Sequence, residues 1–196
     1  MKKALIPILI ILAVLFVGFM IFQGSNNKMV DLDEDVTASW ANVETQYQRR
    51  ADLIPNLVST VKGYADHEKS TLEAVVNARA RATQTTIDPS NMTLEQMQEF
   101  QSAQGELSSA LSRLLVTVES YPDLKANQNF LALQSQLEGT ENRISVARDR
   151  FNGVATTYNK YIRKVPQNIL AGMLGFDKRP LFEADPGSQV APKVSF

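Results

Sequence analysis

His67 is the only histidine in the chain, and it is the first residue to consider for chemistry. Asp66 and Glu68 flank it, so three potential metal ligands are consecutive. Neighbouring residues of a helix or turn do not converge on one point, and a zinc-type site needs further His or Cys ligands. The sequence has no Cys and no second His to supply them. We therefore expect His67 to be a solvated turn residue, with metal binding as the alternative.

Three carboxylates of one long helical segment form a second group of potential ligands: Glu138, Glu141 and Asp149. Metal centres in ferritin-like bundles use Glu-x-x-His motifs on inward faces, and this chain has none. It also lacks a GxSxG nucleophile motif and a GxxxxGK phosphate loop. The sequence therefore predicts no catalytic, cofactor-binding or metal residue, and a protein that is not an enzyme.

Charged residues on two helical segments have a structural interpretation. They are Arg49, Arg50, Glu141, Arg143 and Arg148. Arg50 and Glu141 fall near the rims of apolar stripes, where helices meet, so a cross-helix ion pair could fix their register. The alternative is a set of exposed charges whose stems cover apolar surface. Trp40, Tyr47 and Phe151 lie on the stripes themselves and are interpreted as core, with a binding cleft as the alternative.

The element that organises the chain is a long apolar stripe from Val36 to Val61, with steps of three and four residues. Such steps keep one side of an α-helix apolar, and that side must be buried against other helices. The stripe comprises Val36, Trp40, Val43, Tyr47, Ala51, Ile54, Val58 and Val61. Pro55 lies within this helix and cannot donate to the carbonyl of Ala51, so we expect a kink there.

The soluble part is predicted to form four helices, covering approximately 31–62, 66–83, 93–120 and 127–165. Capping boxes are expected at Ser70–Glu73 and Thr93–Gln96. Short connections make sequential helices antiparallel. The predicted fold class is all-α, with an N-terminal transmembrane helix followed by an antiparallel up-and-down bundle of four long helices.

The segment after Pro166 is rich in Gly and Pro but too apolar for a free tail. We expect a short helix near Asn168–Leu174, followed by an extended segment lying back on the bundle. The chain is therefore divided into an anchor and linker (1–28), a helical bundle (29–166) and a tail (167–196).

An uncharged apolar run extends from Ala4 to Phe22, near the N-terminus. As a helix it would be roughly 28 Å long, close to the thickness of a bilayer core. A cleaved signal peptide is the rival interpretation, but no small-x-small cleavage site follows the run. We expect an uncleaved, single-pass anchor in the lipid bilayer, joined to the bundle by a polar linker, Gln23–Lys28.

Flanking charges predict the orientation of this anchor. Lys2 and Lys3 precede the run, whereas four acidic residues, Asp31, Asp33, Glu34 and Asp35, follow it after Lys28. The positive-inside rule then places the N-terminus in the cytosol and the bundle outside the cytoplasmic (inner) membrane. The net charge of −1 gives no sign of the clustered basic residues that a nucleic-acid partner requires.

Long stretches of the sequence closely resemble the LemA family. They are SWANVETQYQRRADLIPNLVSTVKGYADHEKSTLEAVVNARARA (39–82), YPDLKANQNFLALQSQLEGTENRISVARDRFN (121–152), YNKYIRKVP (158–166), Gly175-Phe176 and the final KVSF. The resemblance implies a bacterial membrane-anchored helical bundle. The family includes a protein of magnetosome membranes, and its genes often lie near those of membrane metalloproteases or TPM-domain proteins. It supplies no catalytic residues to carry over.

We therefore expect a scaffold or protein-interaction module at the cell envelope, whose long helices offer surfaces to partner proteins or to a second copy. The first alternative is an accessory or regulatory subunit of a membrane protease or transporter. The alternative of another class is a cryptic metal-binding protein or hydrolase.

Overall fold

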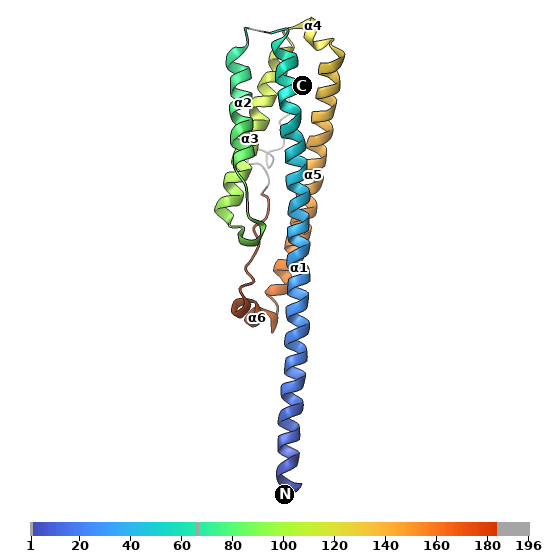
Figure 1. Cartoon of the computed structure of the whole chain (residues 1–196), viewed down its shortest axis with the longest axis vertical. Helices are drawn as coiled ribbons and strands as arrows, with labels where there is room; N and C mark the ends of the chain where they lie inside the picture. Colours follow the sequence, from blue (N-terminus) through green and yellow to red (C-terminus); the bar gives the residue numbers. More distant parts are fainter. Residues whose placement is uncertain (1, 66, 184–196) are drawn as a thin grey trace, which may run out of the picture.

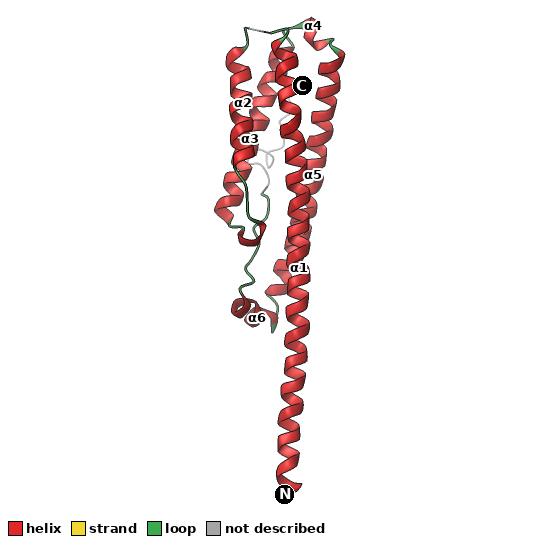
Figure 2. Cartoon of the chain, in the orientation of Figure 1, coloured by secondary structure: helices red, strands yellow, loops and turns green. Residues whose placement is uncertain are grey.

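The computed structural model describes residues 2–65 and 67–183, and every regular element among them is a helix (Figure 2). The elements are α1 (Lys2–Lys62), α2 (Lys69–Gln84), the short 3-10 helix η1 (Pro89–Asn91), α3 (Leu94–Val118), α4 (Pro122–Lys125), α5 (Gln128–Ile162) and α6 (Gln167–Leu174). The predicted all-α class is confirmed.

The bundle consists of the C-terminal half of α1 together with α2, α3 and α5 (Figure 1). α1 runs away from the N-terminus, α2 returns, α3 runs outward again and α5 returns. α4 caps the far end, and α6 lies at the end nearest the apolar half of α1. The predicted up-and-down arrangement of long helices is therefore confirmed.

α1 is one continuous helix of 61 residues, so the anchor and the first bundle helix form a single element. The polar stretch Gln23–Lys28 is helical throughout. Ser25 and Met29, one turn apart, are 6% and 0% exposed, so one side of this stretch already packs against the rest of the protein. Burial of that side outweighs the weak helix propensity of the intervening residues.

α1 also continues through Pro55, and a side chain of α2 completes the backbone hydrogen bonding there. Pro55 has no N–H to donate to the carbonyl of Ala51. Arg79 Nε donates to that carbonyl oxygen at 2.8 Å. Arg79 interrupts the apolar face of α2. Its position there is explained by the Ala51 carbonyl, which Pro55 leaves without a donor.

We expect replacement of Arg79 by Met to lower the free energy of unfolding by about 1–2 kcal/mol, because a buried carbonyl loses its donor while the apolar stem is kept. In the Pro55→Ala background, residue 55 regains an N–H for the same carbonyl, so the same replacement should have a smaller effect. Denaturant unfolding of the four proteins, followed by circular dichroism, measures both. If Arg79→Met lowered the free energy of unfolding equally in the two backgrounds, the hydrogen bond to the Ala51 carbonyl would not be the stabilising contact of Arg79.

One of the two expected helix caps is present. Thr93 and Gln96 form the predicted capping box at the start of α3, with reciprocal hydrogen bonds of 3.0 and 3.2 Å. The box expected at Ser70 is wrong, because the N-cap of α2 is Glu68, two residues earlier, and Glu68 makes no side-chain capping bond. The interior of α2 is fixed by buried Leu72 and Val75, so packing rather than a cap determines where this helix lies.

The interior of the bundle forms two core clusters. The cluster nearer α6 surrounds Trp40, whose ring lies edge-on to Phe100 and Phe151 at centroid distances of 5.3 and 5.5 Å. The far cluster joins the last turns of α1 to α2, α3 and the start of α5. The core assignment of Trp40, Tyr47 and Phe151 is confirmed, since they are 0%, 7% and 0% exposed.

The tail has the predicted form within the described residues. The short helix α6 ends at Gly175, whose φ of +79° is a left-handed conformation that suits glycine. An extended segment then lies back on the bundle, and Phe182 is buried in the core cluster around Trp40. The final residues of the predicted tail (184–196), including KVSF, lie outside the described residues.

Candidate functional site

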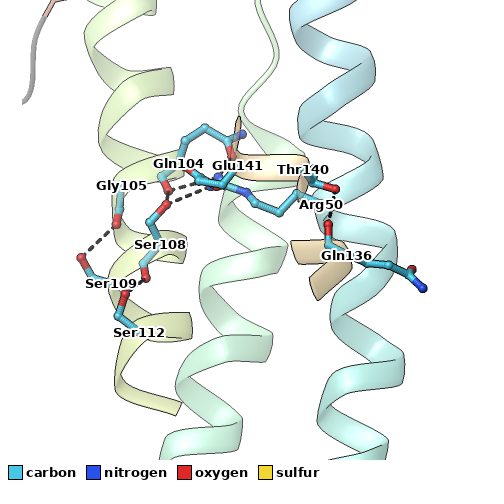
Figure 3. Close-up of polar contacts among 9 residues, drawn as sticks. All are labelled: Arg50, Gln104, Gly105, Ser108, Ser109, Ser112, Gln136, Thr140 and Glu141. Carbon is cyan, nitrogen blue, oxygen red and sulfur yellow. Dashed lines mark hydrogen bonds and ion pairs between the residues drawn. The ribbon is translucent and has the colours of Figure 1, made fainter. Parts of the chain in front are cut away.

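A buried arginine joins three helices in the middle of the bundle (Figure 3). Arg50 of α1 is 2% exposed. Its Nη1 donates to Ser108 Oγ of α3 at 2.9 Å and to Glu141 Oε2 of α5 at 3.0 Å. Its Nη2 donates to Gln104 Oε1 at 2.6 Å and to the carbonyl of Gln104 at 3.3 Å. One guanidinium thus fixes α3 and α5 relative to α1.

Arg50 and Glu141 form the cross-helix ion pair that the sequence left open as one of two interpretations. The Glu141 side chain is 57% exposed, so the carboxylate remains hydrated while the guanidinium is buried. The guanidinium also lies 5.1 Å from the centroid of the Tyr47 ring. The guanidinium orients and fixes its partners through these directed hydrogen bonds.

Gln104 extends this network to the fourth helix. Its Nε2 donates to the carbonyl of Ala82, in the last turn of α2, at 3.1 Å, and the residue is only 7% exposed. A polar layer defined by Arg50, Gln104, Ser108 and Glu141 therefore contacts all four bundle helices. A shift of one helix along another would separate these buried donors from their acceptors, at a cost in free energy, so the layer favours the observed register of the helices.

A shallow cleft lies beside this polar layer. Its lining includes Glu44 and Tyr47 of α1, Phe100 and Gln104 of α3, and threonines from the end of α2 and the loop after it, namely Thr83, Thr85 and Thr86. Burial raises the pKa of Glu44, and the neighbouring Trp40 indole opposes the rise. The titratable side chains of the cleft lining are Glu44 and Tyr47.

A second buried arginine ties the tail to the bundle. Arg179 is 7% exposed, and its Nη2 and Nε both donate to Asp33 Oδ1 of α1, at 2.7 and 3.1 Å. Its Nη1 donates to the carbonyl of Ser90 in η1 at 2.8 Å. The guanidinium therefore joins three segments that are distant in the sequence: α1, the connection before α3, and the tail.

Two asparagines of α5 hold the backbone of the extended tail. Asn159 donates to the carbonyl of Arg179 at 2.8 Å and accepts from its N–H at 2.9 Å. Asn152 does the same for Phe182, at 3.1 and 2.9 Å. Seven helical residues rise about 10.5 Å and three extended residues span about 10 Å, so the two spacings match. We call this arrangement the asparagine clamp.

Two further residues of α5 complete the contact with the tail. Tyr158 donates its hydroxyl to the carbonyl of Asp177 at 2.9 Å. Burial, together with the charge of Asp33, raises the pKa of Tyr158 to about 12, so the donor stays protonated at neutral pH. Arg148 donates to the carbonyl of Glu183 at 3.0 Å and lies 4.8 Å from the Phe182 ring centroid.

The residues considered first for metal chemistry lie apart from these networks. His67 is exposed in the turn between α1 and α2, as expected for a solvated turn residue. Asp66 lies outside the described residues. Glu68 Oε1 accepts a hydrogen bond from the Tyr121 hydroxyl at 3.0 Å, which links this turn to the end of α3.

The three carboxylates of α5 do not converge. Glu138 and Asp149 are exposed, and Glu138 accepts from Gln134 of the same helix at 3.0 Å. Glu141 is engaged by Arg50. In residues 2–65 and 67–183, no group of three or more His, Cys, Asp or Glu side chains is placed to hold a metal ion.

The remaining arginines singled out from the sequence have separate roles. Arg49 is exposed, and Arg143 donates to Thr140 Oγ1 of its own helix at 3.1 Å. Arg148 contacts the tail rather than the polar layer. The pattern of charges therefore identified one true cross-helix pair among several surface residues.

Sequence reasoning missed Arg179, Asp33 and the asparagine clamp. In the sequence, Asp33 is one of the acidic residues that follow the apolar run and indicate its orientation, and nothing near it indicates a partner. Arg179 follows Asp177 and Lys178, so its charge alone does not distinguish it; its place between the apolar residues Phe176 and Leu181 is the one signal that could have found it. Asn152 and Asn159 are seven residues apart on α5, beside the apolar stripe, and this spacing is the corresponding signal for the clamp.

Comparison with known proteins gives one family and several relatives. The sequence model of the LemA family matches residues 39–196. The chain is 28% identical to Magnetosome protein MamQ 2 of Paramagnetospirillum magneticum over 200 residues, which cover 93% of this chain and 73% of that protein. It is 28% identical to Magnetosome protein MamQ of Magnetospirillum gryphiswaldense over 188 residues, covering 86% and 69%. Identity to Protein LemA of Metamycoplasma hominis is 21% over 177 residues, covering 90% and 77%.

Proposed function

The chain belongs to the LemA family, and from that premise we propose that it is a single-pass membrane protein whose helical bundle acts as a scaffold or interaction module at the bacterial cell envelope. In this role the bundle presents its long lateral surfaces to membrane or envelope proteins, and the networks described above keep those surfaces in fixed positions.

The continuity of α1 is the observation that carries this proposal. Its N-terminal part is long and apolar enough to cross a membrane, and the large apolar side chains from Leu9 to Phe22 are 38–65% exposed. The same helix then supplies buried core residues from Met29 to Val61. A helix without a break between anchor and core would hold the bundle at a defined place above the membrane, as a scaffold requires.

The orientation in the proposal follows from flanking charge. Lys2 and Lys3 precede the apolar run, and the acidic residues of 31–35 follow it. The proposal accordingly places the N-terminus in the cytosol and the bundle on the outer side of the cytoplasmic membrane. The relatives include magnetosome proteins and a protein named LemA, and they come from different organisms. A scaffold role fits this range, because one architecture can bind different partners.

The test is purification of the tagged full-length protein from its native membrane in mild detergent, with mass spectrometry and elemental analysis of the eluate. A mock purification from the untagged strain is the control. A stoichiometric membrane protein that co-purifies reproducibly, without metal, would support the proposal, and a protease or transporter in that position would define the scaffold as an accessory subunit. A homo-oligomer that carries stoichiometric metal and no other protein would overturn it in favour of a metal-binding protein or hydrolase.

A further inference from the structure

The short helix α6 carries an exposed apolar surface that the bundle does not cover. Three of its side chains are large, apolar and solvent-facing: Ile169 (61% exposed), Met173 (76%) and Leu174 (42%). Val165 (79%), two residues before the helix, is exposed as well. Elsewhere in the bundle, exposed apolar residues such as Val116 and Val146 are far apart in the sequence. Single exposed apolar residues need no explanation, whereas a contiguous group on one short element indicates a contact surface.

The opposite side of α6 is fixed to α1 just beyond the apolar run. Ala171 is 4% exposed and belongs to the same core cluster as Met29, and Leu170 packs against that cluster. Figure 1 shows α6 as the part of the folded body nearest the N-terminal half of α1. α6 is therefore positioned by a helix whose next turns, toward the N-terminus, are the candidate membrane span.

No spacer separates this end of the body from the apolar run. Phe22, the last apolar residue of the run, is 38% exposed, while Ser25 is only 6% exposed. Three helical residues rise about 4.5 Å, which is less than the depth of a headgroup region. If the run crosses a bilayer, the exposed face of α6 must lie at the level of the lipid headgroups.

Basic residues surround α6 on the adjoining segments. Lys160, Arg163 and Lys164 end α5, Lys178 follows α6, and all four are exposed. Asp177 is the single acidic residue in 160–178. An apolar surface rimmed by Lys and Arg is the composition that favours binding at the surface of a membrane with anionic lipids.

We propose that α6 is an interfacial helix, whose Ile169, Met173 and Leu174 insert, together with Val165 just before it, into the leaflet from which α1 emerges, while the Lys and Arg side chains of the adjoining segments contact anionic lipid headgroups. The position of α6 beside the end of the span favours lipid over a protein partner, because lipid is what surrounds α1 at this level. The inference rests on the proposed membrane anchoring by α1, and it adds a second contact with the same leaflet beside the span.

The test exploits the absence of cysteine from the chain, since a single introduced Cys gives one labelling site. Met173→Cys is labelled with an environment-sensitive fluorophore in the full-length protein, reconstituted into phosphatidylcholine–phosphatidylglycerol vesicles with and without lipids that carry a quencher near the headgroup. Val116→Cys is the matched control, because it is equally exposed (72%) but lies at the opposite end of the bundle, next to α4. Val14→Cys, within the apolar run, reports on the anchor itself.

We expect the Met173 label to shift to the blue and to lose most of its emission to the lipid quencher, while the Val116 label keeps an aqueous spectrum. A Met173 label that is as aqueous as the Val116 label would overturn the interfacial helix. So would a blue shift that the lipid quencher does not affect, because a protein partner or a second copy would then cover the surface. A blue-shifted Val14 label in either case shows that the anchor is within the bilayer, and an aqueous Val14 spectrum would refute the proposed membrane anchoring instead.

Discussion

Replacement of Arg50 by methionine is expected to lower the free energy of unfolding by about 3 kcal/mol, because the substitution leaves buried polar groups without their donor. Gln104 is 7% exposed and would lose the guanidinium from both its side-chain oxygen and its carbonyl. Methionine retains much of the arginine stem volume, so the loss reflects hydrogen bonds and charge rather than a cavity. Denaturant unfolding of the full-length protein in detergent, followed by circular dichroism, measures the change.

The neighbouring Arg49 provides a matched control, because it carries the same side chain on the same helix but is exposed. Its replacement by methionine should change stability by no more than about 0.5 kcal/mol. Similar losses at the two positions would contradict the role assigned to the polar layer.

The ion pair itself is tested by combining Arg50→Met with Glu141→Gln. The carboxylate is 57% exposed, so water screens the pair, and we expect a coupling energy of about 1 kcal/mol. Glu141→Gln alone should destabilise the protein, because a buried guanidinium loses its counter-charge. If the effects of the two replacements on the free energy of unfolding are additive, the ion pair in Figure 3 does not stabilise the protein, although its two side chains lie close together.

Replacement of Phe182 by alanine is expected to lower the free energy of unfolding by about 3 kcal/mol, since a buried aromatic ring leaves a cavity that the helices fill only in part. Phe182 is 6% exposed, and its ring stacks on Trp40 with centroids 5.8 Å apart and lies edge-on to Phe151 at 5.5 Å. Trp40 is the only tryptophan of the chain, so its fluorescence reports directly on this contact. We expect a red shift of its emission and easier quenching by acrylamide.

Leu181 is the control for this replacement, since it precedes Phe182 on the same extended segment but is only partly buried. Leu181→Ala should have a smaller effect on stability and leave the Trp40 emission nearly unchanged. An unaltered emission spectrum in the Phe182 variant would mean that the tail does not cover Trp40 in solution.

The features that sequence predicted well are those determined by neighbouring residues. The stripe from Val36 to Val61 has the helical period, and seven of its eight residues are buried. The exception is Val58, which is only partly buried, because the neighbouring Leu57 takes the core position. The capping box at Thr93 spans one helical turn, so both of its partners are visible together in the sequence. The short helix before Gly175 is marked by a residue type that ends helices in a left-handed conformation.

The features that sequence missed depend on contacts between distant residues. Arg179 and Asp33 are separated by 146 positions, and no local pattern pairs one with the other. The interaction of Arg79 with the Ala51 carbonyl required knowing both that Pro55 leaves an acceptor free and that α2 packs beside it. The helical form of Gln23–Lys28 was missed because its composition is that of a linker, while burial of Ser25 and Met29 on one side keeps it helical.

Because α1 is unbroken, a tilt of its N-terminal part would move the far end of the bundle. About 40 residues separate Phe22 from the end of α1 at Lys62, a length of about 60 Å. If Phe22 lies at the membrane surface, a change of about 10° in the tilt of the span displaces the far end, where α4 and the turn bearing His67 lie, by about 10 Å. A change in bilayer thickness, which alters helix tilt, would thus displace the far end of the bundle sideways. A partner protein bound at that end would be displaced with it.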